Sequence, residues 1–237
     1  MADYKKPDYW QQKARKEGYP ARSVYKLMEI DEKFSLFKIN RANFNAGNPF
    51  RVLDIGAAPG SWSLYVLQKF ARGCISYLKN GFLAAADLSP LSGDLQHTAQ
   101  RSPVLNKQEN DADLNTGNLI NCDNFFFIQG DITTEETRKV ILSKGPYSVI
   151  ISDAAPNTTG NHMIDSARSL DLAETAAAYA EDSLISGGNL ALKIFQGSGT
   201  DVLLKRMRTL FETAKSFKPQ ACRGESVETY FIGLGKI

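Results

Sequence analysis

The sequence predicts an α/β fold built on a mostly parallel, doubly wound sheet of seven strands. Three observations predict it. Short apolar runs alternate with segments of helical periodicity along most of the chain. The first of these runs ends in a turn of small residues that leads into a helix, Gly56 to Gly60. The last two runs are joined only by a loop, so we expect one antiparallel strand near the C-terminus. The length of 237 residues fits a single domain over residues 1–237.

The individual elements follow from periodicity and from turn residues. Residues 9–34 carry apolar anchors at helical spacing, and Gly18-Tyr19-Pro20 interrupts them, so we expect two helices there. We expect Gly187-Gly188 to form a turn before the fifth strand. The expected strands are 51–55, 81–87, 125–129, 147–153, 189–195, 214–218 and 227–234. The expected later helices are 60–72, 134–143, 167–185 and 199–212.

One segment departs from this alternation. Residues 92–124 are polar and rich in asparagine, and acidic residues outnumber basic ones there. Long polar segments of this kind are typical of surface loops. We therefore expect an insertion loop between the second and third strands.

Composition excludes several classes of protein. The three cysteines are far apart and there are two histidines, so neither a disulfide framework nor a metal site is expected. No apolar run approaches the roughly 20 residues of a membrane span, and the N-terminus does not resemble a secretory signal. We expect a cytoplasmic, monomeric protein that does not contact a membrane.

Charge is distributed unevenly along the chain. The net charge is +2, but residues 1–41 hold ten basic against six acidic residues. From Lys205 onward the count is seven basic against three acidic. Two basic ends around a neutral middle favour a surface that faces a polyanion, although solvated helix faces explain the pattern equally well.

The glycine turn predicts a nucleotide-like ligand, because it lets the backbone approach a ligand at the start of a helix. Its spacing, Gly-x-x-x-Gly from Gly56 to Gly60, is not that of a dinucleotide site. Acids that end strands in such sheets bind ribose hydroxyls or an adenine amine, and each alone also suits a turn or a helix cap. Together with the loop, four of them predict S-adenosylmethionine: Asp54, Asp87, Asp131 and Asp153.

Three further charged residues stand out. Lys193 interrupts an apolar strand at its carboxyl end, where desolvation favours a neutral amine that can act as a base. A lysine at a sheet edge with its ammonium in water is the alternative. Glu228 has apolar neighbours in the last strand, with Glu225 as a nearby alternative, and Lys26 lies in a basic N-terminal helix.

At these residues the chain resembles the FtsJ/RrmJ family of ribosomal RNA large-subunit 2′-O-methyltransferases. The resemblance runs from about residue 8 to the C-terminus apart from 92–124, with five motifs in the right order. The matching segments are Ala21–Leu27, Leu53–Ser63, Ser152–Asn157, Leu192–Gly197 and Glu228–Tyr230.

The resemblance implies a Rossmann-like methyltransferase fold, S-adenosylmethionine as cofactor and ribose 2′-O-methylation, with a uridine in the A-loop of large-subunit rRNA as target. It implies a catalytic tetrad of Lys26, Asp153, Lys193 and Glu228. It also implies cofactor contacts from Gly60, Trp62, Asp87, Asp131 and Asp153, to which the loop adds Gly56. A tRNA anticodon-loop 2′-O-methyltransferase, a small-molecule methyltransferase and a non-catalytic RNA-binding module that assists ribosome assembly are the alternatives.

If the substrate is RNA, its phosphates should meet the basic N-terminal helices. Tyr19 and Tyr25 could stack on a base, but aromatic residues on amphipathic helices are more often core. Residues 1–41 are thus expected to face RNA. The candidate phosphate contacts are Lys13, Arg15, Lys16 and Arg22, with Lys205, Arg206 and Arg208 as further candidates.

Overall fold

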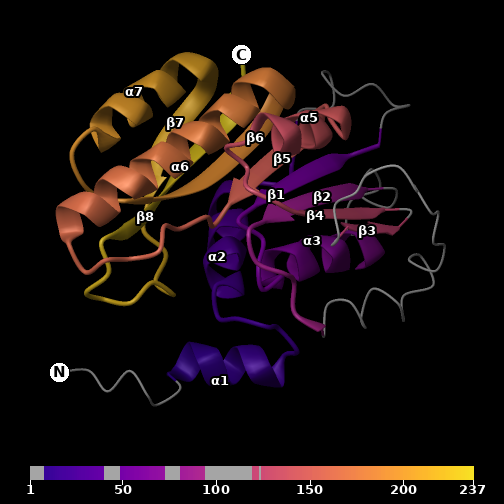
Figure 1. Ribbon diagram of the computed structural model, residues 1–237, viewed down its shortest axis with the longest axis horizontal. Helices are drawn as coiled ribbons and strands as arrows, with labels where there is room; N and C mark the ends of the chain where they lie inside the picture. Colours follow the sequence, from indigo (N-terminus) through magenta and orange to yellow (C-terminus); the bar gives the residue numbers. More distant parts are fainter. Residues whose placement is uncertain (1–7, 40–48, 73–80, 94–118, 123) are drawn as a thin grey trace.

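The computed structural model describes residues 8–39, 49–72, 81–93, 119–122 and 124–237. A single sheet crosses this part of the chain, with helices on both faces (Figure 1). Its strand order is β3-β4-β2-β1-β5-β6-β8-β7. The strands are β1 (Arg51–Ile55), β2 (Phe82–Asp87), β3 (Leu119–Cys122), β4 (Phe125–Gln129), β5 (Tyr147–Ser152), β6 (Leu184–Phe195), β7 (Phe211–Phe217) and β8 (Glu228–Lys236). The helices are α1 (Tyr9–Lys16), α2 (Val24–Phe34), α3 (Ser61–Arg72), α5 (Glu135–Ser143), α6 (His162–Ser183) and α7 (Thr200–Leu210).

The predicted doubly wound sheet is confirmed, and all seven predicted strands are present. Strands β4, β2, β1, β5 and β6 pair in parallel. Strand β8 enters between β6 and β7 and is antiparallel to both, as the direct connection of the last two strands requires. Beside these seven strands, the described residues form an eighth strand at the edge of the sheet. Strand β3 lies within the expected insertion loop and pairs antiparallel with β4, and residues 94–118 of that loop lie outside the described residues.

Two boundaries differ from the predicted ones for local reasons. Helix α6 begins at His162 rather than at residue 167. The Asn161 side chain accepts hydrogen bonds from the amides of Met163 and Ile164, which caps the helix earlier than its apolar periodicity indicates. The expected turn at Gly187-Gly188 lies inside β6, where the register against β5 shifts and Gly187 has a φ of +78°. The two glycines form a bulge in the strand instead of preceding it.

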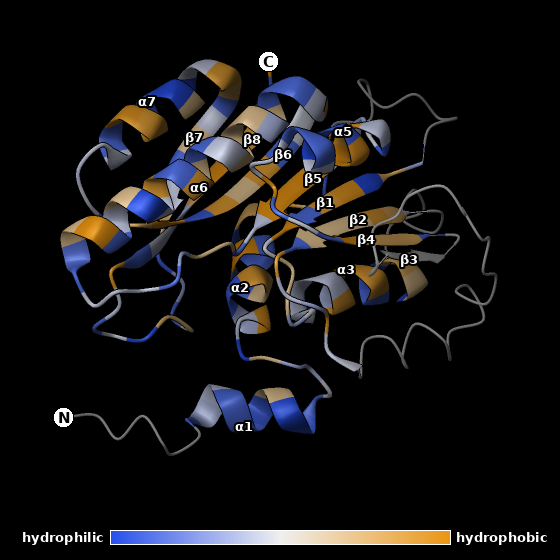
Figure 2. Cartoon of the chain, in the orientation of Figure 1, coloured by the Kyte–Doolittle hydropathy of each residue, from blue (hydrophilic) through white to orange (hydrophobic). Residues whose placement is uncertain are grey.

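Two hydrophobic layers hold the sheet, one on each face. Val52 belongs to the hydrophobic cluster that includes residues of α2 and α3, whereas Leu53, the next residue in β1, belongs to the cluster that includes residues of α6 and α7. This alternation is the period-two geometry of a strand that is buried on both faces. Figure 2 shows that the central strands are hydrophobic, while α6 and α7 carry both hydrophilic and hydrophobic residues. The carboxyl ends of the parallel strands are left as the edge where a site can form.

Helix α2 is fixed on the sheet by its apolar face. Leu27 and Ile30 are fully buried, and burial of such side chains contributes about 1.5–3 kcal/mol each. Tyr25 is also buried, as is Tyr19 just before the helix, so the expectation that these tyrosines are core residues is confirmed. Because Lys26 lies between Tyr25 and Leu27, their burial sets the direction of its side chain.

Helix α1 begins at a capping box, in which Asp8 accepts from the Gln11 amide and the Gln11 side chain accepts from the Asp8 amide. Trp10 packs against Tyr25 of α2 with ring centroids 5.0 Å apart. The predicted break between the two N-terminal helices is confirmed, with Gly18 at a φ of +78°. Among the described helices, none is long and apolar enough to cross a membrane.

Candidate active site

The loop after β1 is pressed against the loop after β5. Gly56 has a φ of +73°, and a Cβ built on it would lie 2.5 Å from the Cα of Ala154. The amide of Gly56 donates to the carbonyl of Ala86 at the end of β2. Only glycine fits this conformation and this contact. The predicted glycine turn is therefore present and packs against the loop after β5, and Gly60, at a φ of +110°, ends the turn.

Three of the four predicted acids lie along this edge of the sheet. Asp87 accepts from the Ala58 amide at 2.9 Å with one carboxylate oxygen and from Ser89 with the other. The amide of Gly130 donates to the Asp87 carbonyl, which places Asp131 beside it. Asp131 accepts from the amide and the hydroxyl of Thr133, and these hydrogen bonds hold its pKa below the ordinary value. Asp131 therefore stabilises the turn that follows β4, whereas Asp87 also contacts the glycine loop through Ala58.

The fourth acid, Asp54, lies beneath the loop. Its side chain is fully buried and accepts from the Ser63 hydroxyl at 2.6 Å. Its second oxygen, Oδ1, is buried without a hydrogen-bond partner in the described structure. Burial raises the pKa of Asp54 to about 7, and the carboxylates of Asp153 and Asp87 add to the effect of burial. A buried carboxyl oxygen without a partner is unusual, and it points to a ligand beside the loop.

Lys193 and Asp153 form a nearly buried ion pair. The Lys193 ammonium lies 2.9 Å from Oδ1 of Asp153 and 2.6 Å from its carbonyl oxygen. The side chains of Lys193 and Asp153 are 8% and 15% exposed, so little water reaches the ion pair. Burial alone would raise the pKa of Asp153, but the charges of Lys193 and Lys26 outweigh burial and lower it. Asp153 is therefore a fixed anion that orients the lysine, and Lys193 is not a solvated lysine at a sheet edge.

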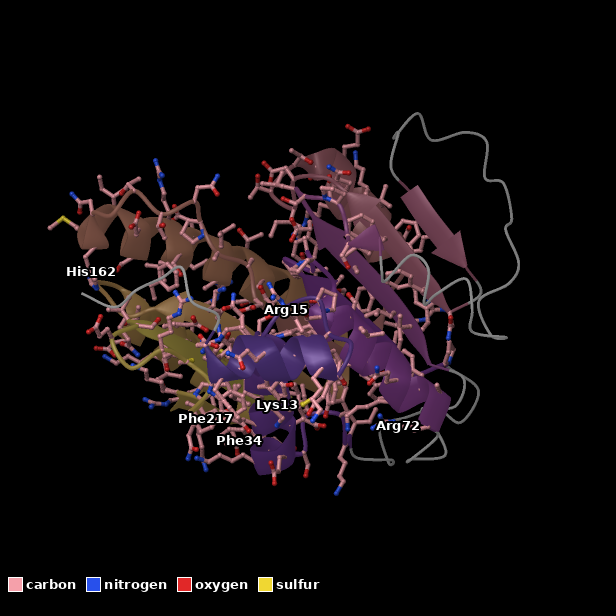
Figure 3. All side chains as sticks on the ribbon, turned by 90° about the horizontal axis from the view of Figure 1, so that it is seen from below. Lys13, Arg15, Phe34, Arg72, His162 and Phe217 are labelled. Carbon is pink, nitrogen blue, oxygen red and sulfur yellow. The ribbon has the colours of Figure 1, made fainter. Side chains whose placement is uncertain are left out.

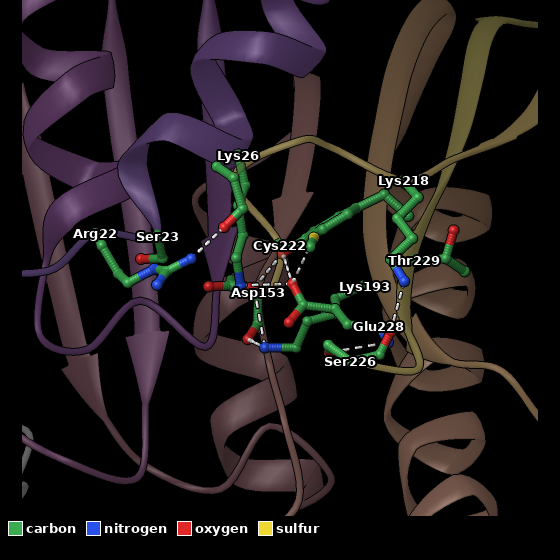
Figure 4. A network of polar contacts seen from close by, with 12 residues as sticks. Arg22, Ser23, Lys26, Asp153, Lys193, Lys218, Cys222, Ser226, Glu228 and Thr229 are labelled. Atoms are coloured by element: carbon green, nitrogen blue, oxygen red, sulfur yellow. Dashed lines mark hydrogen bonds and ion pairs between the residues drawn. The ribbon is translucent and has the colours of Figure 1, made fainter. Parts of the chain in front are cut away.

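Lys26 and Glu228 form a second ion pair beside the first. Their side chains are each 12% exposed, and Lys26 Nζ lies 2.5 Å from Oε1 of Glu228. Burial alone would lower the pKa of Lys26, but the carboxylates of Asp153 and Glu228 outweigh burial and raise it. Figure 4 shows side chains of α2, β6 and β8 converging on Asp153. The structure thus brings the four predicted catalytic residues together, whereas Glu225 is exposed.

Tyr230 joins the two ion pairs, and the sequence reasoning missed its hydroxyl. That oxygen lies 2.7 Å from Oδ1 of Asp153 and 2.7 Å from Oε1 of Glu228. Tyr230 is fully buried, and burial together with the two carboxylates raises its pKa well above the ordinary value. The hydroxyl therefore stays a donor, and it links the two carboxylates in one network. The available signal was its position two residues after Glu228, on the same face of β8.

Two other predicted residues have structural partners. Trp62 is 2% exposed, donates its indole N–H to the carbonyl of Ser23 and packs near Tyr230. It thus ties α3 to the start of α2 and lies in the core. Arg22 is paired with Asp8 and donates to the carbonyl of Ala221, so its guanidinium is engaged within the protein.

The remaining candidate phosphate contacts lie on α1. Arg15 and Lys16 are exposed, whereas Lys13 lies over the rings of Trp10 and Tyr25 and 4.0 Å from Glu17. Figure 3 shows Lys13 and Arg15 on the side of the molecule that α1 covers. On α7, Arg206 pairs with Glu181, and Lys205 and Arg208 are exposed. Among the described residues, no group of His, Cys, Asp and Glu side chains is arranged to hold a metal ion.

Comparison with known proteins decides the family. The model of the FtsJ-like methyltransferase family matches residues 19–236. The chain belongs to the FtsJ-like methyltransferase family. A ribosomal RNA large subunit methyltransferase E from Treponema denticola is 43% identical over 98% of this chain and 96% of that protein. A protein of the same name from Borreliella afzelii is 40% identical over 95% of this chain and 96% of its own length.

Solved structures support the fold of this FtsJ-like methyltransferase. A structure described as a candidate ribosomal RNA methyltransferase from Plasmodium falciparum superimposes with a TM-score of 0.63 at 24% identity, covering 92% of this chain and 98% of that one. Human methyltransferase-like protein 13, in complex with S-adenosylhomocysteine, gives a TM-score of 0.53 at 14% identity, covering 90% and 84%. At these identities the likeness concerns the fold alone.

The residues present fit the cofactor of this family, S-adenosylmethionine. Gly56 lets the loop after β1 lie against Ala154 in the loop after β5, and a carboxyl oxygen of Asp54 lies buried beneath the loop after β1 without a partner in the described structure. Asp87 and Asp131 add carboxylates at the ends of β2 and β4. These carboxylates accept hydrogen bonds and carry negative charge, so they suit a ligand with ribose hydroxyls, an amine and positive charge. This FtsJ-like enzyme is an S-adenosylmethionine-dependent methyltransferase.

Proposed function

We propose that this enzyme transfers a methyl group to the 2′-hydroxyl of a ribose in large-subunit rRNA, with a uridine of the A-loop as the expected target. The observation that carries the proposal is the pair of adjacent ion pairs, Lys193–Asp153 and Lys26–Glu228, beside the glycine loop. The name shared by the Treponema and Borreliella relatives supports rRNA as the substrate.

The cofactor site is assigned to the strand ends. Asp87 binds the ribose hydroxyls, Asp131 the adenine amine, and Gly56 and Gly60 allow the backbone to approach the ligand. Asp153 is assigned to the methionine end because it follows β5 and its amide donates to the carbonyl of Ile55, just before the glycine loop. Trp62 is left out of this assignment, because its indole is buried between α3 and the start of α2.

The reaction needs alignment and a place for one proton. Bound S-adenosylmethionine supplies the methyl group on a sulfonium, which is a good leaving group. Lys193 uses two donor positions on Asp153, and the remaining position of Nζ is assigned to the 2′-hydroxyl. Lys193 first releases one proton of its ammonium to water, which frees a lone pair on Nζ. As the methyl–sulfur bond breaks and the new O–CH₃ bond forms, the O–H bond breaks and this lone pair takes the proton.

Lys26 has a different part in the same step. Its pKa is raised, so its ammonium stays charged and stabilises the negative charge that develops on the ribose oxygen. Glu228 and Tyr230 hold that ammonium and the Asp153 carboxylate in place. Exclusion of water follows from the burial of all four side chains, each at most 15% exposed. Positioning thus supplies a large part of the rate.

The RNA backbone is assigned to the exposed cations of α1. Arg15 and Lys16 contact phosphates, and Lys13 contributes from the same helix. Arg22 shapes this surface through its bonds to Asp8 and Ala221. The monomeric state and the cytoplasmic location stay predictions from the sequence.

Methyl transfer to separated RNA classes tests the proposal. Large-subunit rRNA, small-subunit rRNA and tRNA from cells that lack the protein are incubated with it and radiolabelled S-adenosylmethionine. We expect label in large-subunit rRNA alone, and none in RNA from cells that contain the protein. Label in tRNA alone would make this a tRNA 2′-O-methyltransferase, and binding of the cofactor without label in any class would make it a non-catalytic RNA-binding module.

A further inference from the structure

The loop between β7 and β8 is held on α2 by a carboxylate that the proposed reaction does not use. Glu29 accepts from two consecutive backbone amides, with Oε2 2.7 Å from the Gln220 nitrogen and Oε1 2.8 Å from the Ala221 nitrogen. Both carboxylate oxygens are therefore engaged with one short segment of the loop. Charge-assisted bonds to backbone N–H groups are among the stronger hydrogen bonds.

Three side chains of the N-terminal region contact the loop between β7 and β8 or the start of β8. Lys26 and Glu29 are spaced at i and i+3 on one face of α2, and Arg22 lies in the turn just before this helix. Arg22 donates to the Ala221 carbonyl, so Ala221 is bound through both its N–H and its C=O. Lys26 forms its ion pair with Glu228, the first residue of β8 after this loop.

The clamped segment continues directly into the catalytic network. Ala221 is fully buried, and the next residue, Cys222, donates its thiol to Oε1 of Glu228 at 3.7 Å. The same oxygen accepts from Lys26 and from Tyr230. A movement of the loop would therefore displace a neighbour of the carboxylate that holds the Lys26 ammonium.

We infer that Glu29 is a positioning residue for methyl transfer: through Ala221 and Cys222 it fixes Glu228, and through Glu228 it fixes Lys26. Glu29 lies outside the cofactor loop and makes no contact with Lys193 among the described hydrogen bonds. Loss of the Glu29 carboxylate should therefore lower the rate of methyl transfer and leave the affinity for S-adenosylmethionine unchanged. The inference rests on the proposed function and names a further residue that supports it.

The test compares Glu29→Gln with Glu32→Gln. Glutamine keeps the shape of Glu29 but turns an amide N–H₂ toward a backbone N–H, which breaks one arm of the clamp. Glu32 is exposed on the same helix, so its variant makes the same change of charge and serves as the control. We expect Glu29→Gln to lower kcat about 10- to 100-fold with the KM for S-adenosylmethionine unchanged, and Glu32→Gln to match the wild type.

A second readout follows the loop itself, independent of catalysis. Cys222 is 8% exposed, and burial together with Glu228 raises its pKa to about 12, so its thiol should react slowly with maleimide. In Glu29→Gln the loosened loop should expose Cys222, and peptide mass spectrometry should show faster labelling at this residue. Far-ultraviolet circular dichroism checks that each variant folds.

The outcomes separate this inference from the proposed function. A lower kcat with faster Cys222 labelling, in Glu29→Gln alone, supports it. Unchanged kcat in Glu29→Gln overturns it, whether or not labelling changes, and so does a loss equal to that of Glu32→Gln. Wild-type protein that transfers no methyl group to RNA would overturn the proposed function first, and this inference with it.

Discussion

Replacing Asp54 by asparagine should remove a pH dependence from the stability of the protein. Asp54 is fully buried, and its pKa in the folded state is about 7, against about 4 for an aspartate in an unfolded chain. Between these values the folded state binds a proton that the unfolded state has lost. The free energy of unfolding therefore falls as pH rises through this window, by about 1.4 kcal/mol per pH unit.

The magnitude is about 4 kcal/mol over the whole window, and about 2 kcal/mol of it falls between roughly pH 5 and pH 7. The asparagine of this variant would keep the hydrogen bond from Ser63, because its amide oxygen can take the place of Oδ2 of Asp54. Asp153 does not interfere, because its pKa is lowered and it titrates below this range.

Urea unfolding of the cofactor-free wild type and of Asp54→Asn at several pH values measures the effect. The stability of the wild type relative to the variant should fall steadily from about pH 5 to about pH 7 and then level off. A difference that stays constant over this range would refute the raised pKa of Asp54 and the burial that causes it.

Two further substitutions test the loop and the network. Gly56→Ala should weaken S-adenosylmethionine binding more than about tenfold in calorimetry, because its Cβ would lie 2.5 Å from the backbone of Ala154 and left-handed backbone costs roughly 1–2 kcal/mol. Gly160→Ala, with a φ of +84° but nothing within 4 Å of its Cβ, is the control and should bind as the wild type does; equal losses in both would show that strain alone is responsible. Tyr230→Phe should lower kcat about 10- to 100-fold, because it removes the single O–H that Asp153 and Glu228 share, and a hydrogen bond to a charged group contributes about 1.5–3 kcal/mol. A Tyr230→Phe enzyme with an unchanged kcat would show that the ion pairs need no such link.

The sheet and the glycine loop could be predicted because their signals are local. The apolar runs, their alternation with helices and the turn from Gly56 to Gly60 each depend on neighbouring residues. Strand β3 escaped prediction because Leu119–Cys122 lies in an asparagine-rich segment and, among the described strands, pairs along one edge only, with β4. Edge strands lack the continuous apolar pattern of central ones.

The residues of the candidate site could be predicted from the sequence, but the contacts between them could not. Lys26 and Glu228 are 202 positions apart, and only the resemblance to a family joined them. The role of Tyr230 was hidden because an aromatic residue in an apolar strand is usually core. The sequence predicts that Arg22 faces RNA because its side chain is basic. Its bonds to Asp8 and to the carbonyl of Ala221 depend on tertiary structure, so the sequence does not indicate them.

Nucleoside analysis of the product tests the central claim most directly. Large-subunit rRNA from cells that lack the protein is methylated with wild-type enzyme or with Lys193→Ala, digested to nucleosides and examined by mass spectrometry. The account predicts one new nucleoside with the methyl group on the ribose, formed by the wild type and nearly absent with Lys193→Ala. A methyl group on a base, or a Lys193→Ala enzyme that works at the wild-type rate, would contradict it.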